Sequence, residues 1–186
     1  MILGQATASA DLKLSPGTQI VFPDGSTLNS AVRGFNNTAN GLDATVAGGA
    51  YNNANGDYSA IGGGSDNVTA ADVPSDKYQT IAGGRANLAQ GTGSAIGGGE
   101  TNAALGSGFD NTIAGGFYNT AGDVTDNTGY GTVGGGGYNI ASGDFSTVPG
   151  GFNNIAFGHY SFAAGQNSVA DHNGSRFQES SLVEIP

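Results

Sequence analysis

The chain contains no cysteine and no tryptophan, and only 11% of its 186 residues are charged, against about 25% in an average globular domain. Without cysteine there is no disulfide framework, no thiolate metal site and no cysteine nucleophile. Apolar residues make up 37% of the chain, and much of this fraction is alanine. The chain therefore has few large side chains to bury, and we expect no thick single-chain core.

Basic residues are also scarce. Five Lys and Arg residues stand against fifteen Asp and Glu residues, which gives a net charge of −10 at pH 7. A nucleic-acid backbone needs clustered Lys and Arg side chains, so composition argues against a nucleic-acid partner. No run of apolar residues comes close to the length of about 20 that a membrane-spanning helix needs. Residues 1–10 lack the basic and apolar regions of a secretory signal. We expect no membrane insertion by this segment.

Glycine, by contrast, supplies 35 of the 186 residues, far above the usual share of about 7%. There is no three-residue period, which excludes collagen, but a longer repeat is present. Its copies have lengths of 15, 20, 15, 17, 20, 15 and 15 residues and begin at Thr45, Ala60, Thr80, Ala95, Thr112, Thr132 and Thr147. We number the repeat positions from 1 at each of these residues.

Four columns recur in all or nearly all copies. Position 2 is β-branched, as buried strand sites prefer: Val46, Ile61, Ile81, Ile96, Ile113, Val133 and Val148. Positions 4 and 5 are both glycine, and position 10 is alanine except at Thr69. Position 8 is always asparagine: Asn52, Asn67, Asn87, Asn102, Asn119, Asn139 and Asn154. An imperfect copy precedes the set at 31–44, and another follows it at 162–176.

A copy of fifteen residues with two glycine-containing breaks has room for two strands of about four or five residues and is too short for helices. We therefore predict an all-β fold, a parallel β-solenoid whose coils stack about 4.8 Å apart. In it, the Gly-Gly pair turns a sharp corner, and the asparagines, which tolerate left-handed backbone, form a hydrogen-bonded ladder. The position-2 side chains form the core opposite the alanines.

The expected core is thin. Each coil buries one Val or Ile, one Ala and a shared aromatic side chain such as Tyr58, Phe145 or Tyr160, and this gain falls short of the entropy lost on ordering fifteen residues. We therefore predict that the chain packs laterally against copies of itself.

The repeats divide the chain into an N-terminal β segment with an FPDG turn (1–30), the repeat region (31–176) and a C-terminal extension (177–186). Two copies carry insertions, at 68–79 and 121–131. Insertions in a solenoid project as loops from one edge, where binding often occurs. The best contact candidates are therefore Asp72, Asp76, Lys77, Tyr78, Asp123, Asp126 and Tyr130.

Nothing in the chain indicates an enzyme. Carboxylates such as Asp57 and Asp144 occupy the same turn position in different repeats, and His159 takes that position in another, which is typical of solvated turn residues. A glycosidase needs two carboxylates at a fixed separation beside a cleft. We predict no catalytic residue, no cofactor and no metal site.

The strings YSAIGGG (58–64) and GSAIGGG (93–99), each followed by an asparagine at position 8, resemble the repeating motif of the YadA-like heads of trimeric autotransporter adhesins. The similarity covers about 31–176. It implies a left-handed parallel β-roll assembled as a homotrimer, an extracellular, cell-surface location, and non-enzymatic attachment to a host or environmental surface of protein or glycan.

Two further segments bear on the carrier of this module. Residues 17–31 resemble the FPDGT-type segment that introduces fibrous regions of phage tail fibres, and 162–177 resemble the cap that ends such rolls. The extension 177–186 has no heptads. A shaft or receptor-binding segment of a phage tail fibre, located on the virion tail, is therefore the alternative function.

Overall fold

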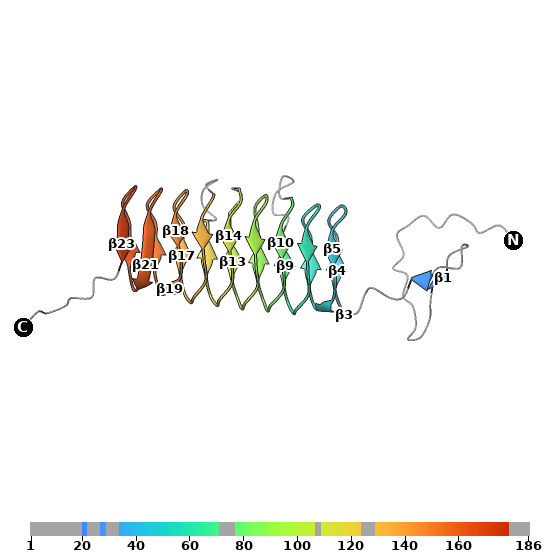
Figure 1. The fold of residues 1–186 in the computed structure, drawn as a ribbon. Helices are drawn as coiled ribbons and strands as arrows, with labels where there is room; N and C mark the ends of the chain where they lie inside the picture. Colours follow the sequence, from blue (N-terminus) through green and yellow to red (C-terminus); the bar gives the residue numbers. More distant parts are fainter. Residues whose placement is uncertain are drawn as a thin grey trace, which may run out of the picture. The chain divides into compact units, whose positions relative to one another are not determined.

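Figure 1 shows a computed structural model of the chain, which describes residues 20–21, 27–28, 34–70, 77–106, 109–123 and 129–178. The chain divides into two compact units, Met1–Ala31 and Val32–Pro186. In the first unit, β1 (Ile20–Val21) pairs antiparallel with β2 (Thr27–Leu28). The FPDG segment predicted as a turn lies outside the described residues.

The second unit is a parallel β-solenoid of about eight turns with about 15 residues in each turn. This confirms the predicted all-β solenoid. Position 1–2 strands of successive turns stack in register, Thr80 beside Ala60 and Ala95. They form the first sheet: β5 (Thr45–Val46), β8 (Ala60–Ile61), β10 (Thr80–Ile81), β12 (Ala95–Ile96), β14 (Thr112–Ile113), β16 (Thr132–Val133), β18 (Thr147–Val148), β21 (Phe162–Gln166) and β23 (Arg176–Gln178), with β19 (Gly151–Phe152) beside β21.

Position 9–10 strands stack in the same way and form the second sheet. Its members are β4 (Thr38–Ala39), β7 (Asn53–Ala54), β9 (Val68–Thr69), β11 (Leu88–Ala89), β13 (Ala103–Ala104), β15 (Thr120–Ala121), β17 (Ile140–Ala141), β20 (Ile155–Ala156) and β22 (Val169–Ala170). The imperfect copies at both ends are therefore coils of the stack. A third line of parallel pairing runs at position 6, from β3 (Gly34–Phe35) and β6 (Gly49–Ala50) through single bridges such as Ser65 with Arg85.

The strands are shorter than the four or five residues predicted. Except for β21 and β23, each strand of the solenoid has two residues. The cause is the backbone at positions 7 and 14, where residues such as Tyr51 and Tyr58 have a φ of 57°. Left-handed backbone cannot continue an extended strand. Each turn of the solenoid therefore has two corners, one at position 7 and one at position 14, which keep its strands short.

The apolar part of the core contains only Ile, Val and Ala side chains, and polar side chains such as Gln79 and Asn111 are buried beside it (Figure 1 shows the two sheets that enclose the core). At position 2, Ile61, Ile81, Ile96, Ile113, Val133 and Val148 are buried and Val46, near the start of the stack, is half-buried. Opposite them lie the position-10 alanines and Thr69, whose hydroxyl donates to Ser59 Oγ at 2.8 Å.

The prediction that aromatic side chains share this core is wrong. Tyr58, Phe145 and Tyr160 are 41%, 48% and 67% exposed. Their position-14 backbone is left-handed, which turns the rings outward, and an interior that holds Ile or Val opposite Ala leaves no room for a ring. The single chain therefore has even less to bury than its composition implies.

The Gly-Gly pair forms a sharp corner, as predicted. Gly84 has a φ of 92°, and a Cβ placed on it would lie 2.2 Å from the carbonyl oxygen of Gly99 in the next coil. Both the backbone conformation and the close approach of the next turn therefore require glycine.

The position-8 asparagines form a continuous buried ladder. Asn67 donates its backbone N–H to Asn52 Oδ1 at 3.1 Å, and its Nδ2 donates to Gly63 O at 3.0 Å and to Gly84 O at 2.9 Å. One prediction about these residues is wrong: none of the seven has a positive φ, and the left-handed residue is the preceding one, at position 7. The asparagines bridge the corner from inside instead of forming it.

Imperfect copies continue the ladder at both ends. Asn37 Oδ1 accepts the backbone N–H of Asn52 at 2.9 Å. At the other end, Ser168 takes the asparagine position, donates its N–H to Asn154 Oδ1 at 3.0 Å and bonds Ala164 O through its hydroxyl at 2.7 Å. The serine hydroxyl donates to one carbonyl, whereas an asparagine amide donates to two, one in its own coil and one in the next.

Candidate binding surface

One long edge of the solenoid carries a row of exposed aromatic side chains. We call this the loop edge, because the insertions leave the stack there, between positions 11 and 13 of their coils. Position 14 of five coils is aromatic and has left-handed backbone, with φ between 54° and 66°: Tyr58, Tyr78, Tyr130, Phe145 and Tyr160. Between the two groups of rings, this position is held by Gly93 and Asp110.

The rings of this row stack on one another. Tyr58 and Tyr78 lie with centroids 5.2 Å apart and an interplanar angle of 13°. Phe145 stacks on Tyr130 at 4.7 Å and 4°, and on Tyr160 at 5.1 Å and 2°. The repeat spacing of the sheet holds successive rings at a favourable stacking distance, so the row is rigid and exposes its edges.

Of the residues predicted to make contacts, the structure places four on the loop edge. Lys77 Nζ lies 3.8 Å from Asp57 Oδ2, Tyr78 and Tyr130 belong to the aromatic row, and Asp123 is half-buried. Asp72, Asp76 and Asp126 lie outside the described residues. The insertions in the sequence predict this edge. The aromatic row was not predicted, although several copies have an aromatic residue directly before the position-15 serine, and this pattern indicates the row.

The row gives an unusual expectation for stability. Phe145→Ala removes two stacking contacts and keeps a left-handed backbone that costs a Cβ-bearing residue about 1–2 kcal/mol. Phe145→Gly removes the same contacts and relieves that cost. Chemical denaturation should therefore find the glycine variant more stable than the alanine variant by about 1 kcal/mol.

The same pair of substitutions at Thr132, an ordinary strand position, serves as the control. There alanine should be the more stable variant, because glycine adds chain entropy to the unfolded state without relieving any strain. The interpretation of the row is wrong if alanine is also preferred at Phe145.

The opposite edge, which we call the glycine edge, carries a second aromatic group at positions 6 and 7. Tyr118 and Tyr138 stack at 5.2 Å and 5°, and Phe117 and Phe152 meet Tyr138 edge to face at 5.3 Å and 5.5 Å. In the coils between this group and the N-terminal end, Arg85 pairs with Glu100. The hydrogen bond and charge of Glu100 raise the pKa of Arg85 above its ordinary value.

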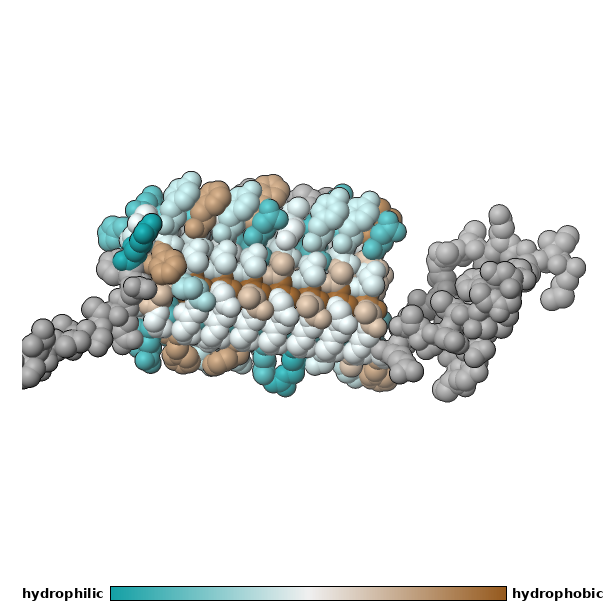
Figure 2. Space-filling model, viewed as in Figure 1, coloured by the Kyte–Doolittle hydropathy of each residue, from teal (hydrophilic) through white to brown (hydrophobic). Residues whose placement is uncertain are grey.

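The broad faces differ from the edges. In Figure 2 the face turned to the viewer is mostly near white, and strongly coloured, projecting side chains gather along the two long edges. Outward residues of the first sheet are small up to β18, such as Thr112 and Ala114, and become large in the last two strands, at Phe162 and Arg176. The second sheet carries an outward aliphatic row at position 9: Val68, Leu88, Ile140, Ile155 and Val169, all half-buried except the exposed Val169.

Titratable groups form isolated pairs in the described part of the chain. His159 Nδ1 lies 3.3 Å from Asp144 Oδ2, and His172 Nδ1 lies 2.5 Å from Asp171 Oδ1, each as an isolated pair. Among the described residues, no group of three or more His, Asp or Glu side chains lies close enough together to bind a metal ion. The described part of the chain also contains no helix that is long and apolar enough to cross a membrane.

These features define a parallel β-solenoid with a thin aliphatic core and two aromatic edges. No protein-family model matches the chain, and no curated protein matches it. The surface itself is therefore the basis for assigning a function.

Proposed function

We propose that the chain is the head module of a trimeric fibrous surface protein and that it attaches, without catalysis, to protein or glycan on a host or environmental surface. The observation that carries this proposal is the exposure of aromatic side chains: none of those described is buried, and their exposure along the two edges reaches 67% at Tyr160. Tyrosine and phenylalanine are enriched at binding interfaces, and large exposed apolar patches mark interaction sites.

The predicted homotrimer is supported by the distribution of apolar residues. The apolar interior of one chain holds only Ile, Val and Ala, and the other buried side chains there are polar. The aliphatic row on the second sheet consists of two groups, Val68 with Leu88 and Ile140 with Ile155 and Val169, separated by Ala103 and Thr120. A neighbouring chain with the same coil spacing would place like groups side by side. We place the subunit contact on this face. The extracellular location and the left-handed β-roll are part of the same proposal and rest on the resemblance at 58–64 and 93–99.

A phage tail-fibre segment is the second candidate, and the FPDG-containing segment at 17–31 favours it. It requires the same trimer and the same exposed edges. The two candidates differ in the carrier, so the sequences that flank this module in its gene separate them: a membrane-anchoring barrel identifies an adhesin, and neighbouring tail genes identify a phage fibre.

Trimer formation has a direct test. Sedimentation equilibrium of the protein should give a particle of three 18.3 kDa chains. Ile140→Lys places a charge in the proposed contact and should yield lighter particles, because an unpaired charge at a desolvated interface is costly. Thr112→Lys, on the outer face of the first sheet, is the matched control and should leave the mass unchanged.

A stable particle of one chain mass at micromolar concentration would refute the trimer. Dissociation by the Thr112 variant and not by the Ile140 variant would refute the assignment of the face.

Attachment is tested on immobilised host-cell and mucin surfaces. The triple variant Tyr130→Gly, Phe145→Gly and Tyr160→Gly retains the left-handed backbone and removes the longer aromatic row. We expect it to keep its melting temperature within a few degrees and to lose most of its adsorption. Equal adsorption of wild type and variant would show that this row has no part in attachment.

A further inference from the structure

The loop edge ends at a cavity that exists because the last two coils depart from the repeat. The backbone N–H of Tyr160 donates to Asp144 O, and that of Gly174 donates to His159 O in the same pattern. Gly174 therefore occupies position 14, where the preceding coils carry Tyr130, Phe145 and Tyr160. With no side chain there, one face of the Tyr160 ring is uncovered.

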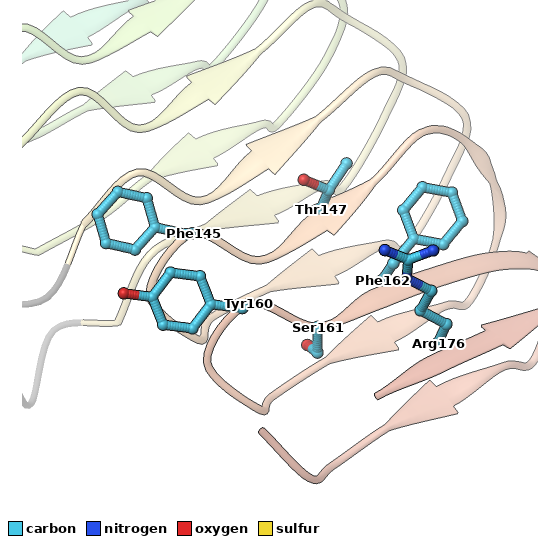
Figure 3. A pocket seen from close by; sticks show the side chains of 6 residues that line it. All are labelled: Phe145, Thr147, Tyr160, Ser161, Phe162 and Arg176. Carbon is cyan, nitrogen blue, oxygen red and sulfur yellow. The ribbon is translucent and has the colours of Figure 1, made fainter. Parts of the chain in front are cut away.

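Position 1 departs from the repeat over the same two coils. In register with Thr147 come Phe162 and then Arg176, where all other complete copies have threonine or alanine. The missing ring on one side and the enlarged side chains on the other enclose a cavity of about 590 Å³, within the size range of small-molecule sites. Its lining residues, shown in Figure 3, are Phe145, Thr147, Tyr160, Ser161, Phe162 and Arg176.

The lining combines three kinds of group. In Figure 3 the rings of Phe145 and Tyr160 lie on one side, Phe162 and the guanidinium of Arg176 lie on the other, and the hydroxyls of Thr147 and Ser161 lie between them. An aromatic wall, the hydroxyl of Thr147 and a planar cation thus border one space.

Among the described Lys and Arg residues, Arg176 is the one without an ion pair, whereas Lys77 is paired with Asp57 and Arg85 with Glu100. The protein has a net charge of −10, and this arginine lies beside an aromatic cavity. Its guanidinium is a fork of donors that matches a carboxylate in bidentate geometry.

The hydroxyl that faces the cavity is that of Thr147, an outward residue of β18. Ser161 is 2% exposed and holds position 15, whose side chains point into the core, as the bond from Thr69 to Ser59 Oγ shows. Thr147 is therefore the hydroxyl available to an occupant.

We propose that this cavity binds a carboxylated pyranose, an acidic sugar residue such as a hexuronic acid or a sialic acid at the surface of a glycan. Arg176 holds the carboxylate, the open face of Tyr160 contacts the C–H face of the sugar ring, and Thr147 bonds a hydroxyl of the sugar. A single positive charge in a strongly acidic protein suits one carboxylate and disfavours a polyanion, which the remaining negative charge repels. The inference deepens the proposed attachment role and rests on it.

The test titrates the purified full chain with the methyl glycosides of glucuronic acid and of N-acetylneuraminic acid, followed by amide NMR shifts. We expect millimolar binding with shifts around Ser161 and Arg176. Methyl glucoside, which lacks the carboxylate, and acetate, which lacks the ring, should bind at least about tenfold more weakly, since a hydrogen bond to a charged group contributes about that factor. The acid that binds more tightly identifies the source of the sugar.

Variants then locate the site. Arg176→Gln should weaken binding of the acidic glycoside at least about tenfold. Gly174→Tyr should abolish it, because the new ring continues the row and fills the cavity. That variant should fold at the modest cost of a Cβ-bearing residue in left-handed backbone, because Tyr130 and Tyr160 occupy the same position with φ of 66° and 57°, and a Cβ on Gly174 meets nothing within 4 Å. Arg85→Gln is the matched control, which makes the same substitution at an arginine of the glycine edge and should leave binding unchanged.

Unchanged binding in Gly174→Tyr or in Arg176→Gln would overturn the proposal, as would equal binding of acetate or an absence of shifts with both acids. These results are separable from the proposed function. A trimer that adsorbs to surfaces and ignores acidic sugars refutes the cavity alone, and a monomer that binds them through Arg176 refutes the trimer alone.

Discussion

Ile113→Asp should leave the chain unable to form its solenoid under conditions in which the wild type is fully folded. Ile113 is completely buried in the middle of the stack. The core around it is aliphatic and contains no cation that could pair with the new carboxylate. Loss of the apolar side chain and burial of an unpaired charge together cost more than about 5 kcal/mol, which equals or exceeds the stability of many domains.

The effect should spread beyond one coil. In a stack, each turn is stabilised only by its two neighbours, so a defect in the middle removes support from both halves. Far-UV circular dichroism and denaturant titration measure the loss. Thr112→Asp, the adjacent and outward residue of β14, is the control and should cost less than about 1 kcal/mol. Similar melting temperatures for the two variants would contradict the inward orientation of Ile113.

The sequence was sufficient to predict the solenoid because the repeat makes each structural requirement visible several times. A β-branched residue at position 2 and an alanine at position 10 predict two facing inner walls, and the structure has Ile81 and Ala89 fully buried there. The Gly-Gly pair predicts a corner, and Gly84 forms one. Periodicity thus identified the residues whose environment is the same in every coil.

Features that depend on backbone conformation were not predictable in this way. Aromatic residues at position 14 fit a core as well as a surface by composition, and only their left-handed φ shows that Tyr58 and Phe145 point outward. The asparagine column was assigned the wrong backbone for a related reason: side-chain chemistry alone does not distinguish a residue that forms a turn from one that bridges it. The terminal cavity arises where Gly174 breaks a column that had not been recognised.

Asn102→Leu should cost at least about 1–3 kcal/mol, because it leaves a buried backbone N–H without a partner and takes a donor from a part-buried carbonyl. Asn102 Nδ2 donates to Gly98 O and to Gly116 O, both at 2.9 Å, and Asn102 Oδ1 accepts the N–H of Asn119 at 3.1 Å. Leucine has nearly the same size and can make none of these bonds. The carbonyl of Gly98 loses this donor and the N–H of Asn119 loses its acceptor, while Gly116 O keeps the N–H of Glu100.

The matched control is Asn53→Leu, the same change at a half-buried, outward asparagine of β7 that accepts an exposed hydrogen bond from the Thr38 hydroxyl, and where other coils carry Val68 or Leu88. Because Asn53 points outward, this variant should stay within about 1 kcal/mol of wild type. Denaturant unfolding compares the two, and hydrogen exchange of the Asn119 amide reports the broken contact directly. If Asn102→Leu is as stable as the control, the asparagine ladder is a by-product of the repeat and the backbone pairing alone maintains the stack.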